Sequence, residues 1–131
     1  MKHYDLSDKT GFVVVHDSQP WRVAVHAYEK DVNGIEAFQA WGVHETSEEA
    51  FVLLQGKGWL FTTKEGLKEE DYEIKPLKPQ ELNLIETGEA HAILLEEGSL
   101  VLIMENEDMS RSHTMPICPG VIAEAKKLVG K

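Results

Sequence analysis

The sequence predicts an all-β protein, a sandwich or barrel of short strands followed by one short helix. Two observations lead to this fold class. Many short segments are rich in β-branched and aromatic residues, and turn-forming residues separate them at close spacing. Such a succession of short strands is typical of sandwiches and barrels. The expected strands are 12–16, 21–28, 35–44, 50–54, 59–63, 72–77, 82–85, 91–95 and 100–105.

The pair Asn33-Gly34, between the second and third expected strands, favours a two-residue hairpin loop. In the register that this loop sets, Val23 lies opposite His44, and both side chains face a largely apolar interior. His26 then lies on the other face of its strand. The hairpin therefore disfavours His26 as a partner of His44 in any site.

Two of the expected strands, 50–54 and 100–104, are apolar at every position. A strand with one face in solvent alternates polar and apolar residues, so both faces of these strands must be covered. The second cover comes either from the facing sheet or from another subunit, and we therefore expect a homodimer. The turn Gly56-Lys57-Gly58 lacks the strand–helix setting of a phosphate-binding loop, and we expect a tight hairpin there.

After Pro119-Gly120 the sequence changes to helical periodicity, with Lys126 and Lys127 near its end, where cations favour the helix dipole. A helix of about nine residues is not stable alone in water. We therefore expect it to dock on the barrel or on a partner. Its apolar face consists of Val121, Ile122, Ala125, Leu128 and Val129.

The composition is that of a globular protein, with 42% hydrophobic and 27% charged residues in 131 residues, which predicts a single domain over 1–131. A formal charge of −10 argues against binding to nucleic acid or to an anionic membrane surface. Cys118 is the only cysteine, so no intrachain disulfide forms, and we expect an inert thiol. No segment has the length of a signal peptide core or a membrane span, so the expected location is the cytoplasm.

Metal-ligand chemistry is concentrated in two short stretches, 43–56 and 86–91. The first contains the spacing His44-x4-Glu49-x6-Gly56, and the second contains Gly88-x2-His91. Two imidazoles and one carboxylate can hold a divalent metal and leave coordination positions open. The alternative is that both histidines are hydrogen-bonded core residues, with Glu49 accepting from one of them.

Glu48 competes with Glu49 for the acidic position. Glu49 is preferred because it shares strand parity with Phe51 and Leu53, whereas Glu48 is expected to face solvent. The remaining histidines are weaker candidates. His3 and His16 are expected at the surface, and His113 is expected in a polar loop. Both Trp41 and Trp59 are expected in the core or in an interface rather than in a ligand-stacking site.

The two stretches resemble the paired motifs of the cupin superfamily, the RmlC-like jelly-roll or double-stranded β-helix barrels. His44, Glu49 and Gly56 match the second histidine, the glutamate and the glycine of the first motif, while Gly42 occupies the position of its first histidine. The resemblance covers about Ile35 to Glu105. The N-terminal strands and the stretch around 105–108 are similar to small single-domain bacterial cupins.

In the second motif, Gly88 and His91 match the family's glycine and histidine. Three positions depart from the pattern. Gln80 replaces a turn glycine, Glu86 replaces a common proline, and Leu95 stands where an asparagine can follow.

The resemblance implies a divalent metal ion, Fe, Mn, Ni or Zn, bound by His44, Glu49 and His91 inside a jelly-roll β-barrel. It also implies a small polar metabolite as ligand or substrate, and an enzyme of the oxygenase or isomerase type is one expectation. A second is a metal-free small-molecule binding or sensing protein without catalysis, which Gly42 favours. A third is a metal-free hydrolase or isomerase with His91 as general base and Glu49 as its orienting partner.

Overall fold

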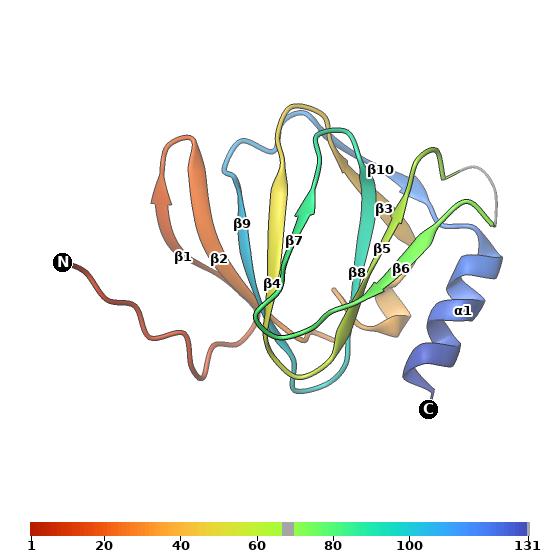
Figure 1. Ribbon diagram of the computed structural model, residues 1–131, viewed down its shortest axis with the longest axis horizontal. Helices are drawn as coiled ribbons and strands as arrows, with labels where there is room; N and C mark the ends of the chain where they lie inside the picture. Colours follow the sequence, from red (N-terminus) through yellow and green to blue (C-terminus); the bar gives the residue numbers. More distant parts are fainter. Residues whose placement is uncertain (67–69, 131) are drawn as a thin grey trace.

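The computed structural model describes residues 1–66 and 70–130, which form two facing antiparallel sheets of five strands each (Figure 1). In spatial order, sheet A contains β1 (Phe12–Ser18), β2 (Trp21–Ala27), β9 (Leu100–Asn106), β4 (Glu49–Gln55) and β7 (Leu82–Ile85). Sheet B contains β10 (Ser112–Pro116), β3 (Ala40–His44), β8 (Ala90–Leu95), β5 (Gly58–Thr63) and β6 (Glu73–Pro76). The predicted all-β jelly roll is confirmed. Its strands form two separate hydrogen-bonded sheets rather than one closed barrel.

The molecule has three layers, because helix α1 (Pro119–Val129) packs on the outer face of sheet B (Figure 1). Trp41, Phe61, Val121 and Ala125 are all buried in the core between this helix and sheet B. A second core, which includes Phe51, lies between the two sheets. The predicted docking of the helix is confirmed, and each fully buried large side chain contributes about 1.5–3 kcal/mol. The described part of the chain contains no helix long and apolar enough to cross a membrane.

Most strands lie where the sequence predicts them, with two exceptions. The expected strand 35–44 is divided into a 3-10 turn, η1 (Ile35–Ala37), and the shorter strand β3. Strand β10 was not predicted, because Ser112–Pro116 is largely polar and ends in proline. β10 pairs only with β3, at the edge of sheet B, where a polar strand with a proline is tolerated.

The hairpin predicted at Asn33-Gly34 is wrong: β2 pairs with β1 and β9, whereas β3 belongs to the other sheet. The buried Asn33 side chain accepts a hydrogen bond from the Glu29 N–H at 2.8 Å and donates one to the Ala27 carbonyl at 3.0 Å. The backbone carbonyl of Asn33 accepts a hydrogen bond from the Leu95 N–H at 2.9 Å. Asn33 therefore stabilises the crossing, the segment in which the chain passes from β2 in sheet A to β3 in sheet B.

Gly34 does not adopt the left-handed conformation that an Asn-Gly hairpin requires, since its φ is −84°. Glycine is needed here for close packing instead. A Cβ atom on Gly34 would lie 2.9 Å from the carbonyl oxygen of Lys30 and 3.0 Å from the Tyr28 ring.

The tight hairpin predicted at Gly56-Lys57-Gly58 is also wrong. The turn connects β4 to β5, which belong to different sheets, so it is a second crossing. Gly56 has a φ of +86°, and a Cβ there would lie 2.6 Å from the Ser99 Cα. The Ser99 hydroxyl accepts from the Lys57 N–H at 2.9 Å and donates to the Lys57 carbonyl at 2.8 Å. These contacts close one end of the sandwich.

Candidate metal centre

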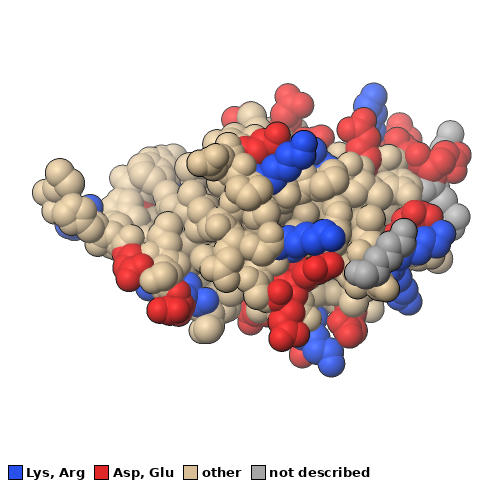
Figure 2. All heavy atoms as spheres, turned by 60° about the horizontal axis from the view of Figure 1, so that its bottom comes forward, with Lys and Arg blue, Asp and Glu red and all other residues tan. Residues whose placement is uncertain are grey.

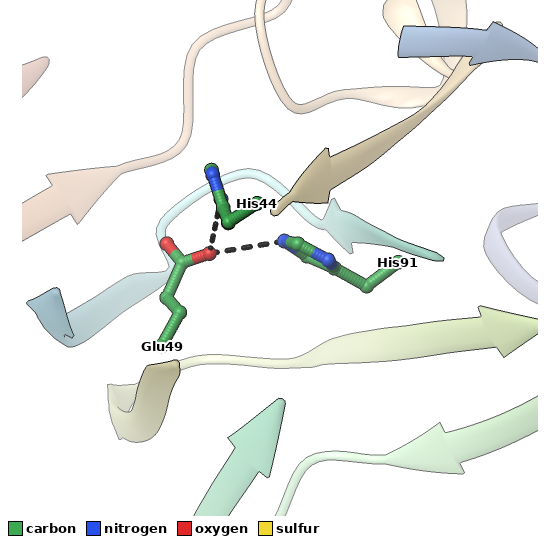
Figure 3. A group of neighbouring side chains, drawn as sticks. All are labelled: His44, Glu49 and His91. Carbon is green, nitrogen blue, oxygen red and sulfur yellow. Dashed lines mark hydrogen bonds and ion pairs between the residues drawn. The ribbon is translucent and has the colours of Figure 1, made fainter. Parts of the chain in front are cut away.

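Three strands bring His44, Glu49 and His91 to one point between the sheets (Figure 3). His44 ends β3 and His91 lies near the start of β8, both on sheet B, while Glu49 begins β4 on sheet A. The Glu49 Oε1 atom lies 2.9 Å from Nε2 of His44 and 3.0 Å from Nε2 of His91. One ligand atom from each residue lies within 4.8 Å of the others. The structure thus brings together all three residues singled out in the sequence.

Strand parity explains why Glu49 and not Glu48 joins this group. Glu49, Phe51 and Leu53 occupy the inner face of β4 and are buried, whereas Glu48 is exposed. Because side chains alternate between faces, a one-residue shift would have exchanged the two carboxylates.

The second ring nitrogen of each imidazole is also engaged. His91 Nδ1 lies 3.1 Å from the carbonyl oxygen of Glu89, which can only accept, so Nδ1 carries the proton there. His44 Nδ1 lies 2.9 Å from the Ser112 hydroxyl. A neutral His91 therefore directs the Nε2 lone pair at the Glu49 carboxylate. That arrangement is favourable only when a proton or a metal cation lies between the two atoms.

The carboxylate and its neighbours have strongly perturbed acidities. Burial raises the pKa of Glu49, but hydrogen bonds from His44, His91 and Glu105 outweigh it and lower that pKa to about 2. The hydrogen bond to Glu49 raises the pKa of His44 above its ordinary value, against the opposing effect of burial. Without a metal, the group is therefore an ionised carboxylate that accepts hydrogen bonds from its neighbours.

Arg22 and Glu105 extend the group across sheet A, and the sequence interpretation missed both. Arg22 pairs with Glu105 across β2 and β9, and Glu105 pairs with Glu49 across β9 and β4. The Arg22 guanidinium donates to the Glu105 carboxylate through Nε, at 2.7 Å, and through Nη2. Burial and the hydrogen bond with Glu49 raise the pKa of Glu105 to about 7, against the effect of Arg22. Parity with Val101 and Ile103 is the signal that points Glu105 inward.

The group lines an open cavity of about 400 Å³ between the sheets. The face predicted for β2 is wrong, because Arg22 and His26 line this cavity and Val23 lies on the opposite face. The false hairpin register caused that error. His26 is nevertheless not part of the three-residue group, and its Nε2 lies 3.1 Å from Glu29 Oε1. The other cavity residues are Phe12, Phe51, Ala92, Ile93, Ile103, Met109 and Ser112.

The donor set fits a divalent metal. Ligand atoms bound at about 2.1 Å and at right angles around one ion lie about 3 Å apart. The two observed nitrogen–oxygen separations, 2.9 and 3.0 Å, match that spacing. An ion would replace the protons between Glu49 and the imidazoles, while the Nδ1 contacts keep both rings oriented. The three residues that would hold it all line the cavity.

The other histidines and tryptophans lie apart from this group. His113 lies on the exposed strand β10 and not in the predicted loop, and its Nδ1 donates to Glu45 Oε2 at 2.8 Å. His3 and His16 are at or near the surface, as predicted. The buried Trp41 and Trp59 belong to the core, which confirms that prediction.

No protein-family model and no curated protein match the chain. Solved structures do. An RmlC-like cupin protein from Desulfovibrio desulfuricans is 18% identical, with a TM-score of 0.55, over 81% of this chain and 96% of that chain. A variant of Streptomyces PAC13 with uridine is 12% identical, with a TM-score of 0.62, over 95% and 98%. Hydroquinone 1,2-dioxygenase from Sphingomonas sp. with 4-hydroxybenzoate bound is 11% identical, with a TM-score of 0.56, over 77% and 69%.

These likenesses define the class of protein by its fold. The chain has the RmlC-like cupin fold, so the resemblance inferred from the sequence motifs is confirmed for the fold. The similar structures include both an enzyme and a protein with a bound nucleoside. The function of this chain therefore has to be argued from its own site.

Proposed function

We propose that the protein is a small single-domain cupin that holds a divalent metal ion with His44, Glu49 and His91. In this proposal the ion binds or helps to convert a small polar metabolite in the adjoining cavity. The observation that supports it is the convergence of two imidazole nitrogens on one carboxylate oxygen at ligand spacing. Fe, Mn, Ni and Zn all accept this donor set.

The chemistry that such an ion supplies is Lewis acidity, and for a redox-active metal also oxygen activation. The protein's own residues hold the ion, orient both rings through Glu89 and Ser112, and surround the ligand with mostly apolar walls. Of the similar structures, one is named as a dioxygenase and holds 4-hydroxybenzoate. That likeness supports a small organic ligand here.

The alternative proposal is a metal-free cupin that binds or senses a small molecule. It is favoured by Gly42, which stands in place of a fourth ligand, and by the two hydrogen bonds that satisfy Glu49 Oε1 in the absence of a metal. In this case the cavity binds the same class of ligand, and protons rather than a metal ion lie between Glu49 and the two imidazoles.

Metal content separates the two proposals. Chelator-treated protein is incubated with Zn²⁺, Mn²⁺, Ni²⁺ or, without oxygen, Fe²⁺, then desalted and analysed for metal. We expect about one ion per chain in the wild type and in the control Glu48→Gln, and none in Glu49→Gln or His91→Ala. Wild-type protein that retains no metal under any of these conditions would exclude the metal-centred function.

We also propose that two copies associate through the outer face of sheet A. The helix covers the outer face of sheet B, but the corresponding face of sheet A has exposed apolar side chains in the described structure. Trp21, Leu54, Leu82 and Leu84 are 40–56% exposed. Five strands of this length cover on the order of 600 Å², near the ~800 Å² per partner of a stable interface.

Charge supports a second copy as the occupant of this face. Two chains of net charge −10 repel each other, so an interface that places no further like charges in close contact is favoured. The outward positions of the three central strands of sheet A are Trp21, Val23 and Val25 on β2, Leu102, Met104 and Asn106 on β9, and Ala50, Val52 and Leu54 on β4. None of these residues is ionisable.

Light scattering during size-exclusion chromatography tests this association. The expected result is a dimer for the wild type and a monomer for Leu84→Glu. The matched control is Val32→Glu, because Val32 is 55% exposed but lies in the crossing between the sheets. Wild-type protein that is monomeric at working concentration contradicts the proposal.

A cytoplasmic location and the absence of nucleic-acid binding complete the proposal. The single cysteine supports the first. For the second, Figure 2 shows acidic side chains interspersed with basic ones, with no cluster of Lys and Arg on the face in view. Phosphate binding needs such a cluster.

A further inference from the structure

Arg22 is the only Lys or Arg among the described residues that line the cavity of the candidate metal centre. Its side chain is 22% exposed, so its charge is partly desolvated but still reachable from the cavity. A guanidinium does not lose its proton in proteins, so this charge is permanent.

The guanidinium has donors left for a ligand. It uses Nε and one N–H of Nη2 toward the Glu105 carboxylate, which is two of its five N–H groups. None of the other three donates to another described residue. The guanidinium also lies over the Phe12 ring, 5.4 Å from its centroid, which fixes its position at the cavity wall.

The charges of the site favour one further negative charge. A divalent ion and Arg22 carry more positive charge than Glu49 and Glu105 together can carry negative charge. A ligand with a single negative charge therefore balances the site. A phosphate-type dianion would give the site a net negative charge. It would also lie close to two carboxylates with only one fixed cation beside it.

The remaining walls are mostly apolar, formed by the Phe12 and Phe51 rings and by Ile93, Ile103 and Met109, with His26 and Ser112 as polar exceptions. Arg22, Glu105 and Glu49 form one row across three neighbouring strands. Their backbone positions span two strand spacings, about 10 Å. A ligand of a few carbon atoms can reach from Arg22 toward the metal-binding group across these walls.

We infer that the cavity selects small monocarboxylic acids with an apolar body, and that Arg22 binds their carboxylate. This inference rests on the proposed function of the same cavity and names its ligand class. Arg22 then acts as the specificity-determining residue through a charge-assisted, paired hydrogen bond.

The test uses benzoate and isobutyrate as probes, each compared with its neutral amide, and benzylphosphonate as the phosphate-type anion. Binding is measured by calorimetry on chelator-treated protein and on protein with Zn²⁺. The variants are Arg22→Gln, Arg22→Lys and the control Arg111→Gln, since Arg111 is the other arginine of the chain and is exposed.

For at least one pair, we expect the wild type and Arg111→Gln with Zn²⁺ to prefer the carboxylate over the amide by about tenfold or more, and to show a smaller preference without Zn²⁺. Arg22→Gln should reduce this preference to about twofold or less, and Arg22→Lys should restore part of it. Arg22→Gln should still take up Zn²⁺ as the wild type does, because it keeps all three metal ligands.

Equal binding of acids and amides by the wild type, or no detectable binding of either acid, overturns the inference. So does a preference that survives in Arg22→Gln, or tighter binding of benzylphosphonate than of both acids. If Arg22→Gln does not fold, the wild-type preference and its change in Arg22→Lys decide. Zn²⁺ uptake on the same samples reports separately on the metal site, so failure of one proposal is distinguishable from failure of the other.

Discussion

Gly42 and His91 lie directly opposite each other on the neighbouring strands β3 and β8. Gly42 also shares a strand face with His44, two residues along β3. Among the described residues, a Cβ atom on Gly42 would meet only the His91 carbonyl oxygen, at 3.8 Å, which is an ordinary contact. Packing therefore does not require glycine at the position where the cupin motif has its first histidine.

Gly42→His is expected to strengthen metal binding, because it adds a fourth side-chain ligand beside His44 and His91. The dissociation constant for Zn²⁺, measured by competition with a chelating dye, should fall by about tenfold or more. Gly42→Ala is the control and should leave the affinity within about threefold of the wild type. A folded Gly42→His with unchanged affinity would show that position 42 does not reach the ion.

The second prediction concerns the two adjacent carboxylates in metal-free protein. Glu49→Gln should lower the free energy of unfolding by about 1–3 kcal/mol, since the buried acceptor of two imidazole hydrogen bonds loses its negative charge. Glu48→Gln, at an exposed position, should change it by about 0.5 kcal/mol or less. Urea unfolding near pH 6 in the presence of chelator measures both. Equal effects of the two substitutions would contradict the burial argument.

A third prediction is the pH dependence of the metal-free protein. The lowered pKa of Glu49 gives stability that is present above its unfolded value of 4.5 and is lost as the pH falls toward 2. The raised pKa of Glu105 gives stability that is present below 4.5 and is lost as the pH rises to about 7. The raised pKa of His44 acts in the same direction above 6.5. Stability should therefore be greatest near pH 4.5.

General charge repulsion has a similar optimum, because the isoelectric point is about 5.0. The variant Glu105→Gln separates the two effects. It should remove on the order of 2–3 kcal/mol of the decline between pH 4.5 and 7 while leaving the global repulsion almost unchanged. Urea unfolding of wild type and variant at a series of pH values checks this. Parallel curves for the two proteins would contradict the assignment to Glu105.

The fourth prediction concerns the crossing between the sheets. Asn33→Ala should destabilise the protein by about 1–3 kcal/mol, because the Glu29 N–H and the Ala27 carbonyl lose their partner in a buried setting. The control is Gln39→Ala, which removes one exposed contact with the Glu36 carbonyl and should cost about 0.5 kcal/mol or less. Thermal unfolding compares them, and similar melting temperatures would refute a structural role for Asn33.

The sequence predicted those features that depend on neighbours along the chain. Alternation and β-branched residues located most strands, and the spacing of His44, Glu49 and His91 identified a group that the fold brings together. Parity with Phe51 and Leu53, together with the motif spacing, was enough to choose Glu49 over Glu48, because these relations lie within one short stretch of the chain.

What the sequence could not predict depends on partners far along the chain. The Asn33-Gly34 pair reads as a hairpin, but the buried amide of Asn33 binds the backbone of the crossing instead. That error exchanged the predicted inner and outer faces of β2, so Arg22 was not predicted to line the site. The role of Arg22 depends on Glu105, which is 83 positions away in the sequence. β10 has too little apolar character to be recognised before its pairing with β3 is known.

The two ends of the sandwich differ in what their residues do. Asn33, Gly56 and Ser99 tie down one end through backbone contacts, whereas His44, Glu49 and His91 lie at the other. Loops at the second end, such as the one that contributes Met109, are thus free to vary in length and sequence while the tied end continues to specify folding. Ligand preference in such a protein can diverge rapidly during evolution without a matching loss of foldability.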